Sequence, residues 1–253
     1  MRFSVIIPNY NNEKWLEKCL KSVLDQTFQD FEIIFVDDMS TDGSVKLAKS
    51  LLRRHDDKVI VNESRRLNGG SRNVGIVKAK GDYIICLDSD DWLKDNTVFE
   101  DIDKGVSGED IIFLDYETLW DVDVTSEAHF DYKDLRTALT DATCAIWTKV
   151  VKSDLMKQTL FPEGNLFEDR IQHYRLVRKA KTFSCLKRVT HVWNKTNKNS
   201  TSQNKELYDP YKFHYSGELY KLAKEVGECE FKHHLKGEIN AYIEQINKMM
   251  EEL

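Results

Sequence analysis

The residues with the clearest chemical potential are three aspartates, Asp88, Asp90 and Asp91, at the end of an apolar run over residues 83–87. The run is typical of a buried β-strand. Carboxylates this close repel one another near a core, and a bound divalent cation would relieve the repulsion. Asp88 and Asp90 are two residues apart, so an extended backbone points both side chains to the same side. The competing interpretation is an acidic turn after a strand.

Two further polar clusters also follow apolar runs. Residues 8–10 (Pro-Asn-Tyr) end the run 3–7, and residues 37–38 (Asp-Asp) end the run 31–36. Between the runs, apolar residues recur at helical spacing. This pattern predicts an α/β fold with a mostly parallel central sheet flanked by helices. Ligands of such sheets bind beyond the carboxyl ends of the strands, so we expect the polar clusters to form one site.

The composition is that of an ordinary globular protein. The 253 residues are 41% hydrophobic and 32% charged, and the net charge of -6 argues against a protein that coats nucleic acid. No run is long enough to span a bilayer, and no secretory signal is visible. The five cysteines are scattered without zinc-site spacing. We therefore expect reduced thiols and a cytoplasmic protein.

Five segments occur in the order of the motifs of a known family. They are Val5–Asn11, Val36–Ser44, Gly70–Gly75, Leu87–Asp91 and Phe167–Asp169. Together they resemble the motifs of family 2 glycosyltransferases with the GT-A fold, including the metal-binding Asp-x-Asp segment. Met39 stands where that family usually has Gly. The similarity is strong over roughly residues 1–95, thins to isolated landmarks up to about residue 200, and is absent after that.

The resemblance implies an inverting, metal-dependent enzyme that moves a sugar from a UDP-sugar to a hydroxyl of a saccharide or glycoconjugate. It implies that Asp90, with Asp88, holds Mn²⁺ or Mg²⁺. Tyr10 would pack beside the base, and Arg72 would contact the base or the diphosphate. The positions expected to bind the nucleotide-sugar are Pro8, Tyr10, Asp37, Asp38, Gly70, Arg72, Asp88 and Ser89, with the uracil imide donating to Asp37 or Asp38.

On the acceptor side, the resemblance implies that Asp169 is the general base and that Glu168 orients the acceptor or its loop. The competing interpretation is that both acids only favour the N-terminus of a helix. Asp91 is expected to cap a helix that begins at Trp92, with a sugar contact as the alternative. His191 is either an additional metal ligand or a packed histidine.

Two aromatic and polar features complete the candidate site. Trp147 is expected in the core, with a sugar-stacking platform as the alternative. Residues 193–204 are polar and without periodicity, which predicts a mobile loop, with a lid over the diphosphate as the alternative. The predicted domains are a GT-A domain over 1–204, divided into a nucleotide-binding half (1–95) and an acceptor half (96–204), and a C-terminal helical extension over 205–253.

The expected partners are a nucleotide-sugar donor and a saccharide or glycoconjugate acceptor, without nucleic acid. The C-terminal helices are candidates for contact with the inner face of a membrane or with a second copy of the chain. Two other functions stay open. A sugar-phosphate nucleotidyltransferase is disfavoured because no Gly-rich loop follows the first strand. A non-catalytic nucleotide-sugar-binding subunit is disfavoured because the carboxylate set is intact.

Overall fold

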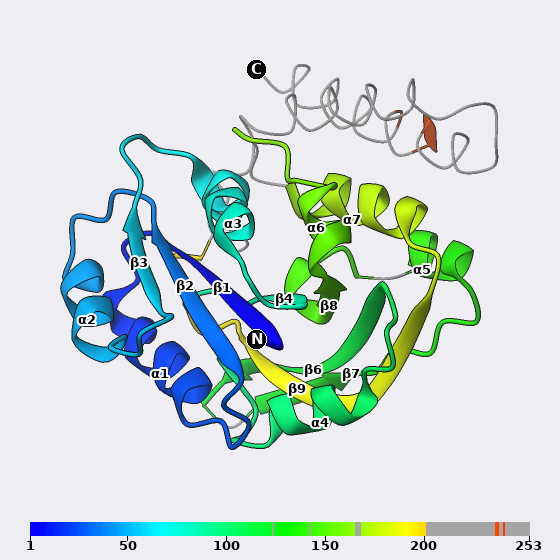
Figure 1. The fold of residues 1–253 in the computed structure, drawn as a ribbon, viewed down its shortest axis with the longest axis horizontal. Coiled ribbons are helices and arrows are strands. Elements are labelled where there is room, and N and C mark those ends of the chain that lie inside the picture. Colours follow the sequence, from blue (N-terminus) through cyan, green and yellow to red (C-terminus); the bar gives the residue numbers. More distant parts are fainter. Residues whose placement is uncertain (123, 142, 165–167, 201–235, 238–239, 241–253) are drawn as a thin grey trace.

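The computed structural model describes residues 1–200 except 123, 142 and 165–167, together with 236–237 and 240 (Figure 1). Phe167 and nearly all of the predicted C-terminal extension, 205–253, lie outside the described residues, so that extension stays a prediction. Among the residues that are described, no helix is both long and apolar enough to cross a bilayer.

The first half of the sheet consists of four parallel strands. They are β1 (Phe3–Asn9), β2 (Phe31–Asp37), β3 (Lys58–Val61) and β4 (Tyr83–Cys86). β1 lies between β2 and β4, and β3 pairs with the outer side of β2. The register aligns Phe3 with Phe31 and Asn9 with Asp37, so these two strands begin and end together. β1, β2 and β4 are apolar runs buried along their whole length, as parallel strands between helices must be.

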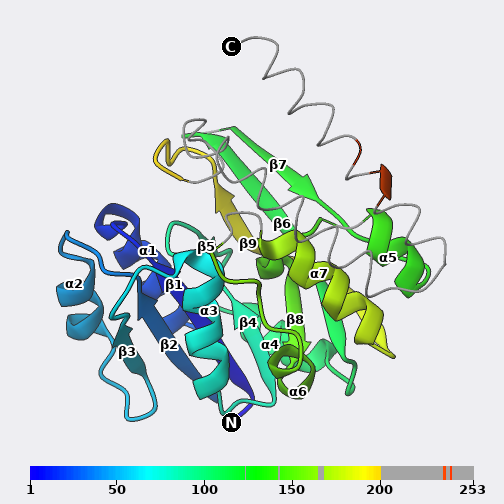
Figure 2. The ribbon, with the colours of Figure 1, turned by 90° about the horizontal axis from the view of Figure 1, so that it is seen from above.

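Helices cover both faces of this sheet (Figures 1 and 2). Because side chains alternate along a strand, Val5 and Ile7 of β1 join one core and Ile6 joins the other. The core with Val5 includes α1 (Glu13–Leu24), α2 (Ser44–Leu51) and α4 (Val98–Gly105). The core with Ile6 includes α3 (Leu67–Lys78), α5 (Leu135–Asp141), α6 (Ser153–Lys157) and α7 (Glu168–Lys179).

The second half of the sheet adds strands that run in both directions. They are β5 (Trp92–Leu93), β6 (Ile111–Asp121), β7 (Val124–Ala128), β8 (Lys149–Lys152) and β9 (Phe183–Asn194). β8 is antiparallel to β4 and carries the sheet across to β6, while β9 runs parallel to β6. The full order is β3-β2-β1-β4-β8-β6-β9-β5, with β7 paired to β6. One continuous sheet therefore joins the two predicted halves of the chain.

Two expectations around the acidic turn are wrong. Trp92 begins the short strand β5 rather than a helix, and the next helix begins only at Val98. Asp91 therefore caps no helix there, and its Oδ1 instead accepts a hydrogen bond of 2.8 Å from the backbone N of Asn194. Residues 193–204 are also not a loop throughout, because Trp193 and Asn194 complete β9. Residues 195–200 follow in turns, and 201–204 lie outside the described part of the chain.

Candidate active site

The carboxyl ends of β1, β2 and β4 lie at one edge of the sheet, as the sequence predicts. Hydrogen bonds join the segments that follow these strands. Asn12 Nδ2 donates to Ser89 Oγ at 3.0 Å, and the backbone N of Asp38 donates to the backbone O of Asn9 at 2.8 Å. Pro8 is buried within β1, opposite Val36 of β2. The three polar clusters are thus held side by side.

Asp37 organises the turn after β2. Its Oδ1 accepts hydrogen bonds from Asn9 Nδ2 at 2.9 Å and from Ser40 Oγ at 2.6 Å, and its Oδ2 accepts one from the backbone N of Ser40 at 2.8 Å. The turn passes through Met39 with a φ of 66°. This is the left-handed region that favours glycine, which explains why Gly is usual at this position of the motif.

Asp38 holds the beginning of α3. Its Oδ1 accepts hydrogen bonds from the backbone N of Arg66 at 2.8 Å and from Asn62 Nδ2 at 2.9 Å. Its Oδ2 accepts one from the backbone N of Leu67 at 2.9 Å. A carboxylate at this end of a helix satisfies unpaired N–H groups and interacts favourably with the helix dipole. Asp38 therefore fixes the position of the helix that carries Arg72.

The aromatic ring of Tyr10 and the guanidinium of Arg65 are stacked beside Asp38. The guanidinium of Arg65 lies 3.3 Å from the ring centroid of Tyr10, and its Nε lies 3.4 Å from Asp38 Oδ2. Tyr10 is 45% exposed. An exposed aromatic ring under a guanidinium, next to a carboxylate, suits a planar base with an N–H donor.

The two glycines at the start of α3 permit close packing. A Cβ atom at Gly69 would lie 2.8 Å from Cγ of Glu168, and one at Gly70 would lie 2.6 Å from Cβ of Arg66. Gly69 therefore allows α3 to approach α7. Gly70 faces Arg66, the residue directly before its own helix.

Arg72 is the centre of the site. Its side chain is 2% exposed, and it bonds three carboxylates. Nη2 donates to Asp88 Oδ1 at 2.6 Å, while Nη1 donates to Glu168 Oε1 at 2.7 Å and to Asp169 Oδ1 at 3.0 Å. Its planar fork is thus directed at protein carboxylates, not at an open surface. Arg72 thus bridges the Asp-x-Asp segment and the Glu-Asp segment, which are expected on opposite sides of the reaction.

Glu168 and Asp169 begin α7 but differ in their surroundings. Glu168 is 4% exposed, and burial followed by the charge of Asp169 raises its pKa to about 8. Asp169 is 25% exposed; burial raises its pKa, while Arg72 and Lys149 act in the opposite direction. The backbone N of Ile146 also donates to Asp169 Oδ2, at 3.4 Å. Burial therefore favours the protonated form of Glu168, while the more exposed carboxylate of Asp169 is the better candidate to accept a proton.

The carboxylates of the acidic turn, residues 88–91, repel one another, as expected from the sequence. Burial and the charge of Asp88 raise the pKa of Asp90 to about 6, and burial together with Asp90 and Asp88 raises that of Asp91 well above its ordinary value. Asn197 Nδ2 donates to Asp90 Oδ2 at 2.7 Å. Asn197 lies just after β9 and was not predicted as a site residue, because a contact 107 positions away leaves no local signal.

The donor set of this turn fits a hard divalent cation in part. Carboxylate oxygens are the ligands that Mg²⁺ and Mn²⁺ prefer, and a positive charge would relieve the repulsion at Asp90. Within the described residues, no three or more His, Cys, Asp or Glu side chains are arranged to hold a metal ion. Asp88 and Asp90 would therefore share a cation with substrate oxygens and water.

His191 belongs to an aromatic cluster. Its ring centroid lies 4.6 Å from that of Trp147 and 6.0 Å from that of Tyr116, and its Nδ1 lies 2.9 Å from Thr190 Oγ1. Burial lowers the pKa of His191 to about 3. Trp147 is 5% exposed and lies in the core, as expected. The structure thus supports the packed alternative for both residues.

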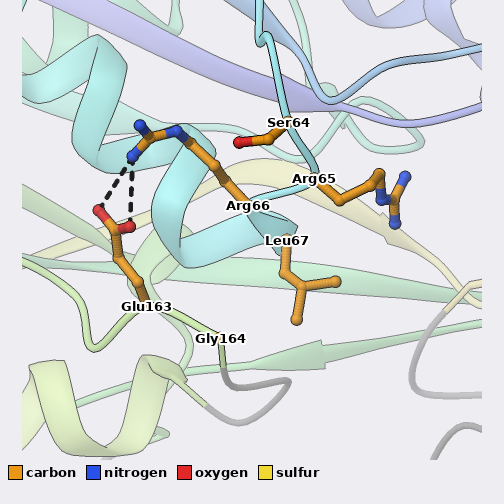
Figure 3. Close-up of a pocket in the computed structure, with 6 residues that line it drawn as sticks. All are labelled: Ser64, Arg65, Arg66, Leu67, Glu163 and Gly164. Carbon is orange, nitrogen blue, oxygen red and sulfur yellow. Dashed lines mark hydrogen bonds and ion pairs between the residues drawn. The ribbon is translucent and has the colours of Figure 1, made fainter.

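Beside α3 the surface is hollowed (Figure 3). The hollow measures about 450 Å³ and is lined by Ser64, Arg65, Arg66, Leu67, Glu163 and Gly164. Arg66 reaches across it to Glu163, with 3.2 Å between Nη1 and Oε2. One wall comes from the segment before α3 and the other from the segment that leads to Asp169, so the hollow lies between the two halves of the site.

Comparison with known proteins agrees with the motifs. Residues 4–114 match the sequence family described as "Glycosyl transferase family 2". The chain is 41% identical over 97 residues to "Glycosyltransferase GlyG" of Streptococcus pneumoniae, which covers 38% of this chain and 32% of GlyG. It is 36% identical over 101 residues to "Poly(ribitol-phosphate) beta-N-acetylglucosaminyltransferase TarS" of Staphylococcus aureus, which covers 39% of this chain and 18% of TarS. The matched stretches thus span about a third or less of these relatives.

The fold is also similar to a solved structure. The crystal structure of S. aureus TarS 1–349 in complex with UDP-GlcNAc superposes with a TM-score of 0.78 at 22% sequence identity, covering 96% of this chain and 72% of that one. At this identity the likeness concerns the fold alone. Residues 4–114 therefore belong to glycosyl transferase family 2, and the described part of the chain has a GT-A-like architecture.

Proposed function

We propose that this chain is a metal-dependent glycosyltransferase that moves a sugar from a UDP-sugar to a hydroxyl of a saccharide or glycoconjugate, with inversion at the anomeric carbon. The observation that carries the proposal is the contact of Arg72 with Asp88 on one side and with Glu168 and Asp169 on the other. A single displacement needs a leaving-group site and a base fixed relative to each other across one reacting carbon.

On the acceptor side, Asp169 accepts the proton of the attacking hydroxyl. Its Oδ1 is held by Arg72 and its Oδ2 by the backbone N of Ile146, so the carboxylate is fixed in orientation. Glu168 holds Arg72 from the buried side. Its role is therefore to orient Arg72, whereas the sequence favours a contact with the acceptor or its loop.

On the donor side, Tyr10 and Arg65 offer a stacking surface for uracil, and Asp38 offers an acceptor beside it. Asp88 and Asp90 would hold Mn²⁺ or Mg²⁺, which supplies positive charge for the departing diphosphate. Asn197 keeps Asp90 in place from the end of β9.

The relatives indicate which substrates to test first. TarS is named for the transfer of N-acetylglucosamine to poly(ribitol-phosphate), and its structure similar to this one holds UDP-GlcNAc. We therefore place UDP-GlcNAc first among donors, and a poly(ribitol-phosphate)-like glycoconjugate first among acceptors.

The first experiment measures hydrolysis and thermal shift for a panel of nucleotide-sugars with Mn²⁺, and then compares the wild type with Asp169→Asn. The variant preserves shape but accepts no proton, so we expect the transfer rate to fall by about 100-fold or more while UDP affinity stays within about threefold. Calorimetry measures UDP binding, and product formation measures transfer.

Asp131→Asn is the matched control, because the Asp131 carboxylate is 83% exposed and pairs with Lys187 on the surface. Its transfer rate should equal that of the wild type. If Asp169→Asn keeps its transfer rate, another residue is the base. If the wild type binds UDP-sugars but turns over none of the panel, the chain is a nucleotide-sugar-binding subunit instead.

A further inference from the structure

A lysine without exposed surface lies on the inner side of the proposed base. Lys149 is the first residue of β8 and is fully buried. Its Nζ donates to the backbone O of Thr143 at 2.9 Å, to the backbone O of Ala145 at 2.8 Å and to Thr148 Oγ1 at 3.2 Å. These three acceptors match the three N–H donors of an ammonium group.

The acceptors of Lys149 belong to the segment that contacts Asp169. Thr143 and Ala145 directly precede the 3₁₀ turn η1 (Ile146–Thr148). The first residue of that turn, Ile146, donates its backbone N to Asp169 Oδ2. The ammonium therefore holds the carbonyl groups of a segment whose next amide faces the base.

The charge of Lys149 also has no carboxylate of its own. Among the described residues, no carboxylate oxygen lies within ion-pair distance of its Nζ, whereas a buried ammonium is normally paired. Asp169 is the carboxylate whose charge interacts with it most, since each group favours the charged form of the other. A Met or Leu would fill the same space without the cost of desolvating a charge.

We propose that Lys149 is a positioning residue for the acceptor-side base: it fixes the segment 143–146 against Asp169 and supplies the positive charge that keeps Asp169 ionised. The inference rests on the proposed function for its catalytic meaning.

The proposal predicts a pH dependence. Burial lowers the pKa of Lys149 to about 8, while the charges of Cys144 and Asp169 act in the opposite direction. The other groups that face it are the ring of Phe113, 5.8 Å from Nζ, and His173, whose own pKa is held well below its usual value by burial and by Lys149. As the pH rises through about 8, Lys149 loses its charge and one donor, so the transfer rate of the wild type should fall there.

The main test compares Lys149→Met with Lys152→Met, which lies on the same strand but is exposed. For Lys149→Met we expect kcat to fall by about 10-fold to 100-fold, UDP affinity to stay within about threefold, and the acid limb of the pH–rate profile to move to higher pH. Lys152→Met should keep the wild-type profile. A purely structural role would lower the amount of folded enzyme but leave both limbs of the profile in place. An unchanged kcat and profile in Lys149→Met would overturn the proposal.

A second test needs neither enzyme activity nor the Lys149→Met variant. The Cε resonance of Lys149, followed by NMR over pH in ¹³C-labelled protein, gives its pKa in the wild type and in Asp169→Asn. Removal of the Asp169 charge should lower the pKa of Lys149 by about half a pH unit or more. An unchanged value would overturn the coupling. If the coupling is present but no UDP-sugar is turned over, the proposed function fails while the charge pairing stands.

Discussion

Two adjacent carboxyl groups at the beginning of α7 differ in exposure, and this difference separates their chemistry. The side chain of Glu168 is 4% exposed and that of Asp169 is 25% exposed. Burial is the largest cause that raises the pKa of both, and Arg72 opposes it in both. Burial therefore favours a shared proton on Glu168, whose charge is harder to solvate. Asp169 keeps the charge that a general base needs.

Met39 is strained where its motif usually has glycine. Its φ of 66° places a non-glycine residue in the left-handed region, and its side chain is 43% exposed, so packing gives little in return. We expect Met39→Gly to be more stable than Met39→Ala by about 1 kcal/mol, because both remove the side chain but only glycine removes the strain. Urea unfolding of the two variants measures the difference. An alanine variant as stable as the glycine variant would show that the turn has relaxed.

At the scale of elements, the turn between β4 and β5 holds carboxylates that oppose folding when no cation is bound. The pKa of Asp90 is raised to about 6 in the folded state, so the fold favours its protonated form. Stability from this group is fully present below its unfolded pKa and is lost as the pH rises through about 6. We expect Asp90→Asn to raise the stability of the metal-free protein at pH 8 by on the order of 1 kcal/mol, and to have little effect at pH 4.

Urea unfolding in the presence of a chelator, at both pH values, measures this gain. Asp131→Asn is again the exposed control and should show none. Thermal shift with Mn²⁺ and UDP gives the functional counterpart: the wild type should be stabilised and Asp90→Asn should not. A variant that is stabilised by Mn²⁺ and UDP as strongly as the wild type would refute the assignment of Asp90 as a metal ligand.

The elements differ in how far the sequence predicts them. β1, β2 and β4 are mainly apolar runs, interrupted inside only by Ser4 and Glu32, and buried along their length, so the sequence predicts them well. The ends of these strands also locate Asp38 and Asp88 correctly. β5 has two residues and exists only because it pairs with β9, so no local pattern distinguishes it from the start of a helix. The predicted cap at Asp91 failed for this reason.

In the candidate site too, residues marked by a local sequence pattern were predicted, and residues that depend on contacts in the fold were not. The acidic residues were found because motifs mark them. Lys149 and Asn197 were missed because their roles depend on contacts that arise only in the folded chain. For Lys149 one local signal exists: a charged residue at the start of an apolar strand, in a position where its neighbours are buried. A polar residue in such a position is a reason to search for a buried partner.

At the scale of the molecule, the guanidinium of Arg72 joins the two halves of the site, alongside the contacts of Arg66 with Glu163 and of Asn197 with Asp90. Arg72 lies on α3 in the nucleotide-binding half, and two of its three carboxylates lie on α7 in the acceptor half. The sheet also runs through both halves, by way of β4 and β8. Within the described residues, the positions of Asp88 and Asp169 relative to each other are therefore set by packing in one continuous fold.

The variant Arg72→Met tests how much of the free energy of unfolding depends on the positive charge of Arg72. The variant removes the cation that Asp88, Glu168 and Asp169 share, so we expect a loss of about 3–5 kcal/mol at pH 7. Arg72 opposes the rise in the pKa values of Glu168 and Asp169, so both pKa values should rise further without it. The loss should therefore shrink at pH 5, where protonation removes the unpaired charges. Urea unfolding at both pH values measures it, with the exposed Arg53→Met as the control. An equal loss at both pH values would mean that the packing of the side chain, not its charge, holds the two halves together.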